Sequence, residues 1–176
     1  MNGLKTLVLV GHPKHSESKL NAAMAEAWSL LDGVSVRWVG DDRLDVAAEQ
    51  AAVSKADAVV FQYPLYWYGP PACLKRWMDE VLTWGWAFGP NGGLLGGRTL
   101  GCSITVGGKL ADYEELGKHG VTLESLAVPI QRTGNYVGMK WMGTFGMDPK
   151  GMAEFHENNG LHLALKSWLD RGLSRG

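Results

Sequence analysis

The feature that most constrains this chain is a series of short apolar runs that alternate with amphipathic segments. Leu4 to Gly11 (LKTLVLVG) is continuous, rich in β-branched residues and ends in glycine, which predicts a strand buried on both faces. Ala58 to Gln62 (AVVFQ) is expected as a further buried strand, and Arg98 to Val106 as the fourth strand, ending at Gly107-Gly108. Val34 to Val39 alternates like an ordinary strand. A short fifth strand is expected near Lys140 to Phe145.

Helical patterns separate these strands, and they are expected over Leu20 to Leu31, Val46 to Lys55, Pro71 to Leu82, about Thr122 to Tyr136 and about Lys150 to Leu173. The third of these is the clearest, because its apolar side chains recur on one face and its charged side chains on the other. Buried strands that alternate with helices imply a parallel sheet covered on both sides, with right-handed crossovers. For 176 residues this predicts one domain over residues 1–176: an α/β, flavodoxin-like three-layer sandwich whose five-stranded parallel sheet has the order 2-1-3-4-5.

The composition excludes several classes of protein. Lysine and arginine total 17 against 18 acidic residues, so there is no basic surplus for a nucleic-acid partner. No apolar run approaches the roughly 18 residues that span a bilayer, and none near the N-terminus suits a signal peptide, so a cytoplasmic location is expected. Cys73 and Cys102 are expected in the core rather than in a disulfide. The histidines lack ligand spacing, so no metal is predicted, and His156 and His162 are expected to be solvated on the closing helix.

Ligands of such sheets bind at the carboxyl ends of the strands, which directs attention to the loops after the first, third and fourth strands. The first loop combines hydroxyls, an amide and a helix N-terminus, where free N–H groups and the helix dipole favour an anion such as phosphate. Its candidate residues are His12, Ser18, Lys19, Leu20 and Asn21. The simpler interpretation is that Ser18 merely caps the helix. The phosphate-loop motif GxxxxGK[ST] and the dinucleotide motif GxGxxG are both missing from the sequence.

The second loop places three consecutive aromatic residues directly after a buried strand, and its candidates are Pro64, Leu65, Tyr66, Trp67 and Tyr68. These side chains could fill the core, but a flat cofactor explains them better, because buried Tyr and Trp need partners for their polar atoms.

The third loop begins with Thr105, Val106, Gly107 and Gly108, where paired glycines allow close approach of the backbone to a ring. Tyr113 and His119 follow, and a phenol and an imidazole could donate and accept a proton. Taken singly, both would more often be surface residues than catalytic ones.

Several motifs in these loops resemble those of one known family. The segment from Gln62 to Leu82 (QYPLYWYGPPACLKRWMDEVL) is close to Q-[FY]-P-L-x-W-[YF]-x-x-P-A-x-L-K-x-W-x-[DE]-x-V. The opening H-P-x-x-x-x-S-x-x-N, the later I-T-x-G-G and a tyrosine six residues before a histidine also match. Over about residues 4 to 145 the sequence resembles the flavodoxin-like NAD(P)H:quinone oxidoreductases, a group that includes DT-diaphorase, bacterial modulator-of-drug-activity proteins and ancillary subunits of glutathione-gated potassium efflux systems.

The resemblance implies an enzyme that passes hydride from NADH or NADPH, through a flavin, to a quinone or similar acceptor. The flavin, FMN in preference to FAD, would have its phosphate on the first loop and its ring along Leu65 to Tyr68 and Thr105 to Gly108. Tyr113 and His119 match the pair that steadies charge on the reduced flavin and protonates the quinone. Val106 departs from the family, which usually has a second threonine there.

The resemblance also implies a homodimer, because family members borrow aromatic residues from the partner's loop to complete the substrate pocket. Trp86 and Phe88 occupy that place in this chain. The alternative function is a regulatory subunit of a glutathione-gated potassium efflux system, associated peripherally with the transporter at the inner face of the membrane. An electron-carrier flavodoxin is disfavoured, because the chain lacks a strongly acidic balance and the T-x-T-G-x-T loop.

Overall fold

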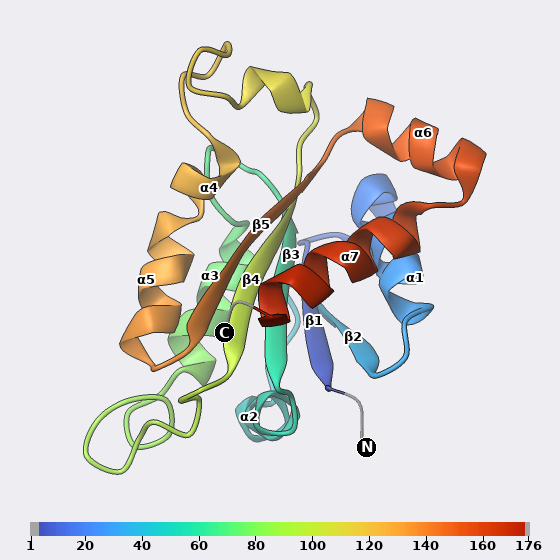
Figure 1. Cartoon of the computed structure of the whole chain (residues 1–176). Coiled ribbons are helices and arrows are strands. Elements are labelled where there is room, and N and C mark those ends of the chain that lie inside the picture. Colours follow the sequence, from blue (N-terminus) through green and yellow to red (C-terminus); the bar gives the residue numbers. More distant parts are fainter. Residues whose placement is uncertain (1–3, 175–176) are drawn as a thin grey trace.

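The computed structural model describes residues 4–174 and contains one five-stranded sheet in the order β2-β1-β3-β4-β5, with every neighbouring pair parallel (Figure 1). The strands are β1 (Thr6–Gly11), β2 (Val34–Val39), β3 (Ala58–Pro64), β4 (Thr99–Thr105) and β5 (Lys140–Met147). This confirms the predicted flavodoxin-like fold class and strand order. The apolar runs correspond to β1 and β3, and β4 lies beside them with several small and hydroxyl residues. The residues of all three strands are buried almost throughout because helices cover both faces.

Helices form the two outer layers. They are α1 (Lys19–Ser29), α2 (Val46–Ser54), α3 (Ala72–Val81), α4 (Leu123–Leu126), α5 (Val128–Tyr136), α6 (Pro149–Asn158) and α7 (Leu161–Ser174), with short 3-10 turns η1 (His15–Glu17) and η2 (Leu110–Asp112). One hydrophobic cluster joins the sheet to α1 and α7, and the other joins it to α2, α3 and α5. No helix within residues 4–174 is long and apolar enough to cross a membrane.

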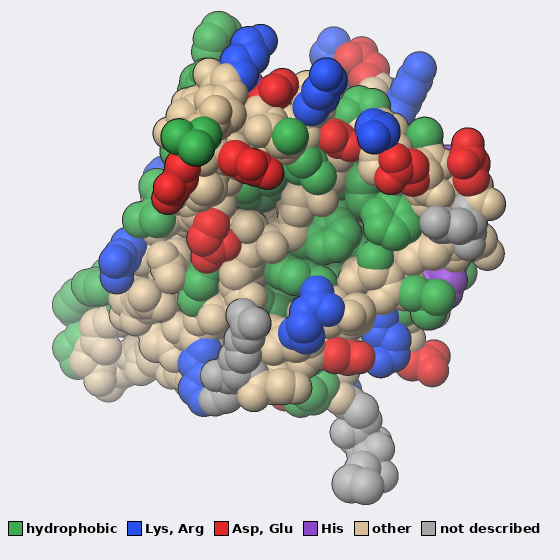
Figure 2. Space-filling model, turned by 45° about the horizontal axis from the view of Figure 1, so that its top comes forward, with side chains coloured by type: hydrophobic (Ala, Val, Ile, Leu, Met, Phe, Trp, Pro, Cys, Tyr) green, Lys and Arg blue, Asp and Glu red, His purple; other side chains and the backbone are tan. Residues whose placement is uncertain are grey.

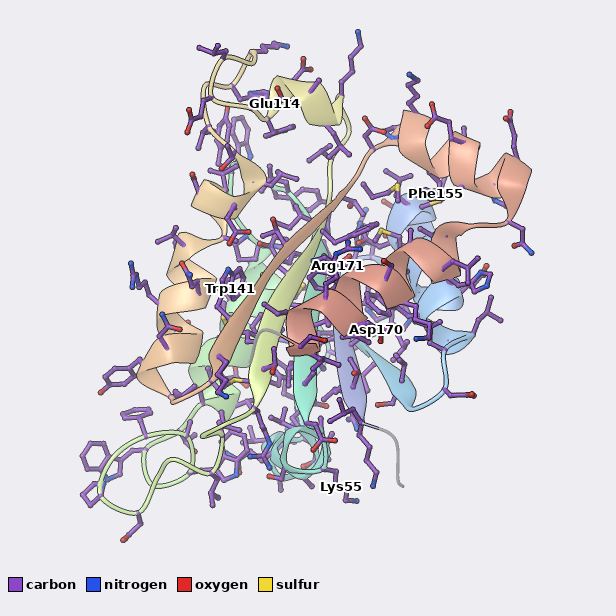
Figure 3. The ribbon with its side chains drawn as sticks, in the orientation of Figure 1. Lys55, Glu114, Trp141, Phe155, Asp170 and Arg171 are labelled. Carbon is purple, nitrogen blue, oxygen red and sulfur yellow. The ribbon has the colours of Figure 1, made fainter. Side chains whose placement is uncertain are left out.

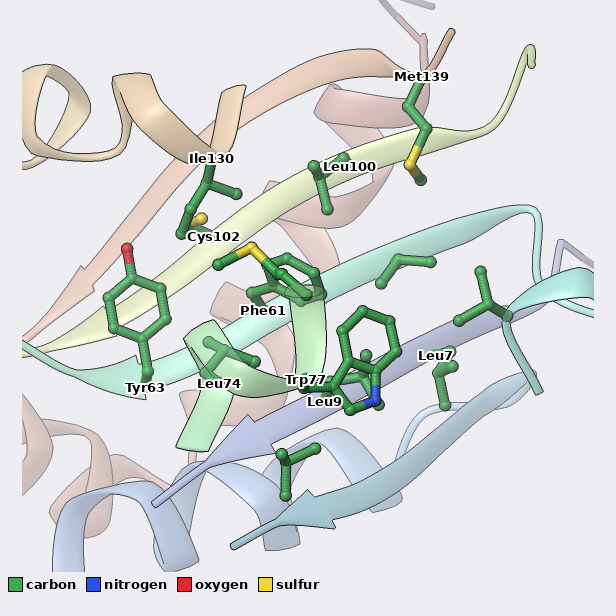
Figure 4. Packing of buried hydrophobic residues seen from close by; sticks show 14 of the residues in the cluster. Leu7, Leu9, Phe61, Tyr63, Leu74, Trp77, Leu100, Cys102, Ile130 and Met139 are labelled. Carbon is green, nitrogen blue, oxygen red and sulfur yellow. The ribbon is translucent and has the colours of Figure 1, made fainter. Parts of the chain in front are cut away.

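The α3 face of the sheet has a dense aromatic and aliphatic core (Figure 4). Leu74 and Trp77 from α3 pack against Phe61 of β3, and the rings of Phe61 and Trp77 meet edge to face with centroids 5.6 Å apart. Each such side chain contributes about 1.5–3 kcal/mol when it is fully buried. Beside them lie the Tyr63 phenol and the Cys102 thiol, and burial raises the pKa of both groups, so both remain protonated in the core.

Two expected helices are each divided in two. The segment near residues 122–136 forms α4 and α5, because Pro129 at the start of α5 has no N–H to continue the preceding helix. The closing helix stops at Asn159, which has a left-handed φ of 49°, and α7 begins two residues later.

This second break corrects the expectation for two histidines. His156 ends up on α6 and His162 on α7, and both line a cavity of about 270 Å³ between these helices and α1. Phe155, labelled in Figure 3, lines the same cavity. His156 is exposed, as expected, whereas His162 is half-buried.

The aromatic loop of residues 83–97 lies at the end of the sheet where β4 begins, drawn yellow-green at the lower left of Figure 1. Trp84 is 69% exposed, while Trp86 and Phe88 are half-buried against the core. Phe88 contacts both Trp84 and Tyr136, with ring centroids 5.7 and 5.8 Å apart. The chain therefore carries two aromatic groups at opposite ends of its sheet, one in this loop and one after β3.

Candidate functional site

The loops after β1, β3 and β4 emerge at a single edge of the sheet, as the topology predicts. Figure 2 brings this edge forward and shows basic and acidic side chains interspersed around it, with hydrophobic side chains between them. The mixture agrees with a formal net charge of −1 and leaves no large field of one sign.

His12 begins the first loop and is buried. Its Nδ1 accepts a hydrogen bond from the Lys14 amide at 3.1 Å, so Nε2 carries the proton of the neutral ring and donates it to the Tyr66 hydroxyl at 3.2 Å. Burial lowers the pKa of His12, and the ring therefore stays neutral at pH 7 while presenting an N–H. This contact ties the first loop to the second.

The start of α1 holds polar atoms that are buried without a partner. Ser18 occupies the N-cap position, yet its side chain caps nothing, so the simpler interpretation of this residue is wrong. Its Oγ and the Oδ1 of Asn21 are both buried and make no hydrogen bond within the described chain. Asn21 Nδ2 donates to Thr105 Oγ1 at 3.0 Å, which connects α1 to the end of β4. Buried polar atoms are almost always hydrogen-bonded, so this cluster is built for a polar ligand.

The loop after β3 contains a tight, strained turn. The main chains of Tyr66 and Gly69 exchange two hydrogen bonds, of 3.0 and 3.1 Å. Between them Trp67 and Tyr68 have φ values of 49° and 66°, the pattern of a type I′ turn that usually requires Asn or Gly. Left-handed backbone at two such residues costs about 1–3 kcal/mol each. Trp67 is 97% exposed, so its own packing does not offset the strain.

The third loop brings three rings together. Tyr113 stacks on His119 with centroids 4.3 Å apart, and the Tyr68 hydroxyl lies 3.2 Å from His119 Nδ1. Burial raises the pKa of the half-buried Tyr113 phenol, which keeps its proton at neutral pH. The start of α6 holds this loop in place, because Asp148 accepts a hydrogen bond from the Leu110 amide at 2.8 Å.

Main-chain donors at this edge are also available. Within residues 4–174, the amides of Trp67, Tyr68, Gly107 and Gly108 donate to no other group of the chain. A Cβ at Gly107 would meet nothing within 4 Å, so the backbone there faces open space. The two loops thus offer four N–H groups beside aromatic side chains, a set suited to the carbonyl and nitrogen atoms of a flat polar ring.

Most of the predicted site residues gather at this edge. Three groups are linked by contacts: His12 with Tyr66, Asn21 with Thr105, and Tyr68 with Tyr113 and His119. Lys19 is exposed, Leu20 packs partly into the α1 core, and Pro64 and Leu65 continue the pairing of β3 with β4.

Three predicted residues lie differently from the rest. The Val106 side chain is 2% exposed in the α3-side core, so this residue offers the site its main chain alone. Trp86 and Phe88 lie at the opposite end of the sheet and cannot reach the loops of their own chain.

One residue of this region, Gln62, was not among the predicted site residues. Gln62 is fully buried beneath the loops, and its amide contacts both Asn21 and Trp28. The available signal was a glutamine within a buried apolar strand. Among the described residues, no group of three or more His, Cys, Asp or Glu side chains is placed to hold a metal ion.

The strained turn generates a stability prediction. Trp67→Asn should raise the free energy of unfolding of the ligand-free protein by about 0.5–1 kcal/mol, because Asn adopts positive φ more readily than Trp. Urea unfolding followed by circular dichroism measures this change. Trp84→Asn is the matched control, since Trp84 is also an exposed loop tryptophan but does not have a positive φ. Equal effects of the two substitutions would contradict the strain argument.

Comparisons with known proteins place the chain in a family. A family model described as "Flavodoxin-like fold" matches residues 4–171. The glutathione-regulated potassium-efflux system ancillary protein KefF of Enterobacter sp. (strain 638) is 40% identical over 145 residues, which cover 80% of this chain and 81% of KefF. The crystal structure of general stress protein 14 from Treponema denticola, in complex with FMN, has a TM-score of 0.84 at 31% identity and covers 96% of this chain and 99% of that one.

A crystal structure of an NADPH-quinone reductase from P. pentosaceus has a TM-score of 0.80 at 25% identity, covering 92% of this chain and 95% of that one. The family model spans the whole described sheet and its loops, and the match with KefF covers four fifths of the chain. The chain therefore belongs to the flavodoxin-like family of NAD(P)H quinone oxidoreductases, the group that includes KefF and general stress protein 14.

Proposed function

We propose that this protein is a flavin-dependent NAD(P)H:quinone oxidoreductase that transfers two electrons from NADH or NADPH to a quinone or similar acceptor. The observation that carries the proposal is the meeting of unpartnered buried polar atoms, free main-chain donors and aromatic side chains at one edge of the sheet. A bound flavin supplies the hydride chemistry there. The chain's own task is to bind, orient and manage protons.

The start of α1 fits the phosphate of a flavin mononucleotide. α1 has 11 residues, and its first-turn amides, at Lys19, Leu20 and Asn21, point toward its N-terminus as donors for an anion. The unpartnered Ser18 Oγ adds a side-chain donor, whereas the Nε2–H of His12 is already engaged by the Tyr66 hydroxyl and ties that loop to the first. The FMN complex of general stress protein 14 supports FMN, and FAD is the alternative that the mass of the extracted flavin would reveal.

The turn after β3 and the Gly107-Gly108 segment are inferred to hold the ring. Their four free amides are donors for its polar edge, while Trp67 and Tyr68 supply aromatic surface beside it. Because Trp67 is almost fully exposed, it is available to wall the space in which a nicotinamide or a quinone would stack.

Tyr113 and His119 are inferred to manage the proton that a quinone requires when it receives hydride. The Tyr113 phenol retains its proton at neutral pH, because burial raises its pKa. His119 stacks on this phenol, and the Tyr68 hydroxyl beside His119 Nδ1 orients its ring. The pair can therefore donate one proton and steady the negative charge that reduction creates.

We also infer that the active form is a homodimer. Trp86 and Phe88 are remote from the site of their own chain, and Trp84 beside them is largely exposed. A second copy would cover these aromatic side chains, and they would in turn close the substrate pocket of that copy.

A second candidate function is that of an ancillary subunit that docks on a membrane potassium-efflux transporter. The 40% identity with KefF supports it, and in this role the protein would act in the cytoplasm at the inner face of the membrane. Purified protein that binds flavin tightly, yet oxidises neither NADH nor NADPH with any of a set of quinones, would favour this second function over the first.

The phosphate site is tested by the double substitution Ser18→Ala with Asn21→Ala. It should weaken FMN binding about 10- to 100-fold, because a hydrogen bond from Ser18 to a charged phosphate is worth about 1.5–3 kcal/mol and 1.4 kcal/mol is a factor of ten. Asn21→Ala also removes the contact with Thr105 that fixes the first turn of α1. Fluorescence titration of the apoprotein measures the affinity. Ser29→Ala, at the other end of α1, should leave the affinity for FMN unchanged. If the double variant also binds FMN with wild-type affinity, the phosphate does not bind at the start of α1.

The proton-transfer role is tested by Tyr113→Phe combined with His119→Ala. Quinone turnover should slow by about 10²- to 10⁴-fold while the protein keeps its flavin absorbance. In the wild type, ionisation of Tyr113 should not reduce turnover until the pH exceeds about 10, because the shift of its pKa is upward. His156→Ala, at an exposed histidine on α6, is the control, and wild-type turnover in the first variant would refute the assignment.

The dimer is tested by Trp86→Asp, which places a charge among the aromatic side chains of the 83–97 loop. Light scattering at micromolar concentration should show a dimer for the wild type and a monomer with reduced turnover for the variant. Leu163→Asp provides the control, since Leu163 is an exposed apolar residue on α7. If the wild type is a fully active monomer, the substrate pocket is not shared between two copies.

A further inference from the structure

Gln62 is a polar residue inside the apolar layer between the sheet and α1. Its side chain is fully buried, and its neighbours on this face of the sheet include Val10 and Val60. Burial of an amide is unfavourable unless all of its hydrogen-bonding groups find partners. An aliphatic side chain of similar size would fill this position without that requirement, so the contacts made by the amide are the feature to explain.

Both ends of the Gln62 amide are bound to the same helix. Its Nε2 donates to the main-chain oxygen of Asn21 at 2.9 Å, and its Oε1 accepts from Trp28 Nε1 at 2.9 Å. Asn21 and Trp28 are seven residues apart, which is two turns of α1, so both face the sheet. Gln62 therefore hydrogen-bonds α1 at two points. These two bonds fix the position of the helix along its axis and its rotation about that axis, relative to β3.

The first of these points is at the site itself. The same Asn21 whose carbonyl oxygen receives the Gln62 amide sends its own side-chain amide to Thr105 at the end of β4. Ser18, with its unpartnered Oγ, stands at the N-cap one turn earlier. A displacement of the first turn of α1 would move every one of these groups relative to β3 and β4.

We propose that Gln62, held in turn by Trp28, is a positioning residue for the phosphate end of the bound flavin: it sets the place of the first turn of α1 and so aligns the donors that hold the phosphate. This inference rests on the proposed function. It assigns Gln62 no contact with the flavin, and it predicts that the loss of Gln62 affects the phosphate more than the ring.

The experiment compares two flavins that differ in the phosphate alone. Apoprotein of the wild type and of Gln62→Met is titrated with FMN and with riboflavin. Met has a similar length but cannot make either hydrogen bond. In the variant, FMN affinity should fall about tenfold, while riboflavin affinity should change less than about twofold, so the preference for FMN shrinks about fivefold or more.

Trp28→Phe supplies the second variant, because it leaves the Gln62 Oε1 without its donor and keeps an aromatic ring at this buried position. It should reduce the FMN preference in the same direction. The matched control is Trp77→Phe on the other face of the sheet. Trp77 is also a buried tryptophan whose Nε1 donates a hydrogen bond, to Glu49 at 2.9 Å. A comparable loss of stability in this control should leave the FMN preference unchanged.

The possible results distinguish failure of the positioning role of Gln62 from failure of the proposed phosphate site. If the wild type prefers FMN and both variants keep that preference, or lose affinity for the two flavins equally, the positioning role is overturned and the proposed function stands. If the wild type does not prefer FMN over riboflavin, or binds neither, the phosphate site fails and the inference fails with it. Should Gln62→Met not fold, the comparison of Trp28→Phe with Trp77→Phe decides the matter.

Discussion

Parallel pairing of β1, β3 and β4 is the constraint on which the rest of the structure depends. Val10 pairs with Gln62, and Gln62 with Ser103, so the three strands end at nearly the same level. Because the strands run in the same direction, the loops that follow them must emerge together. Helices on both faces protect this ladder, and the strands can therefore be apolar on both sides.

Within that frame, the site combines two kinds of polar group. Some are already satisfied and act as fixed supports, as in the contact of Asn21 with Thr105 or the tie from Asp148 to the Leu110 amide. Others, such as Ser18 Oγ, are buried and find no partner among the residues that the structure describes. A satisfied support stiffens its loop, whereas an unsatisfied group favours a ligand.

The sequence predicted the parts of the molecule that depend on local periodicity and on topology. β1 and α3 follow from a continuous apolar run and from an amphipathic stripe, and the convergence of three loops follows from their order. The two helix breaks were missed, because Pro129 and Asn159 act locally within patterns that otherwise continue.

Sequence patterns did not predict the features of the site that depend on contacts between residues far apart in the chain. The inward direction of Val106 depends on the alternation of β4 continuing one residue beyond the strand. The role of Gln62 depends on contacts 34 and 41 residues away, with Trp28 and Asn21, which no local motif records.

The turn after β3 has a consequence for selectivity. Its shape is fixed by main-chain bonds between Tyr66 and Gly69, and by contacts of Tyr66 and Tyr68 with the loops on either side. A guest that meets this turn does not have to freeze a mobile segment, so little ordering entropy is lost on binding. A rigid wall of this kind selects by outline, and it would reject a puckered ring through steric overlap even if that ring carried the same hydrogen-bonding groups as a flat one.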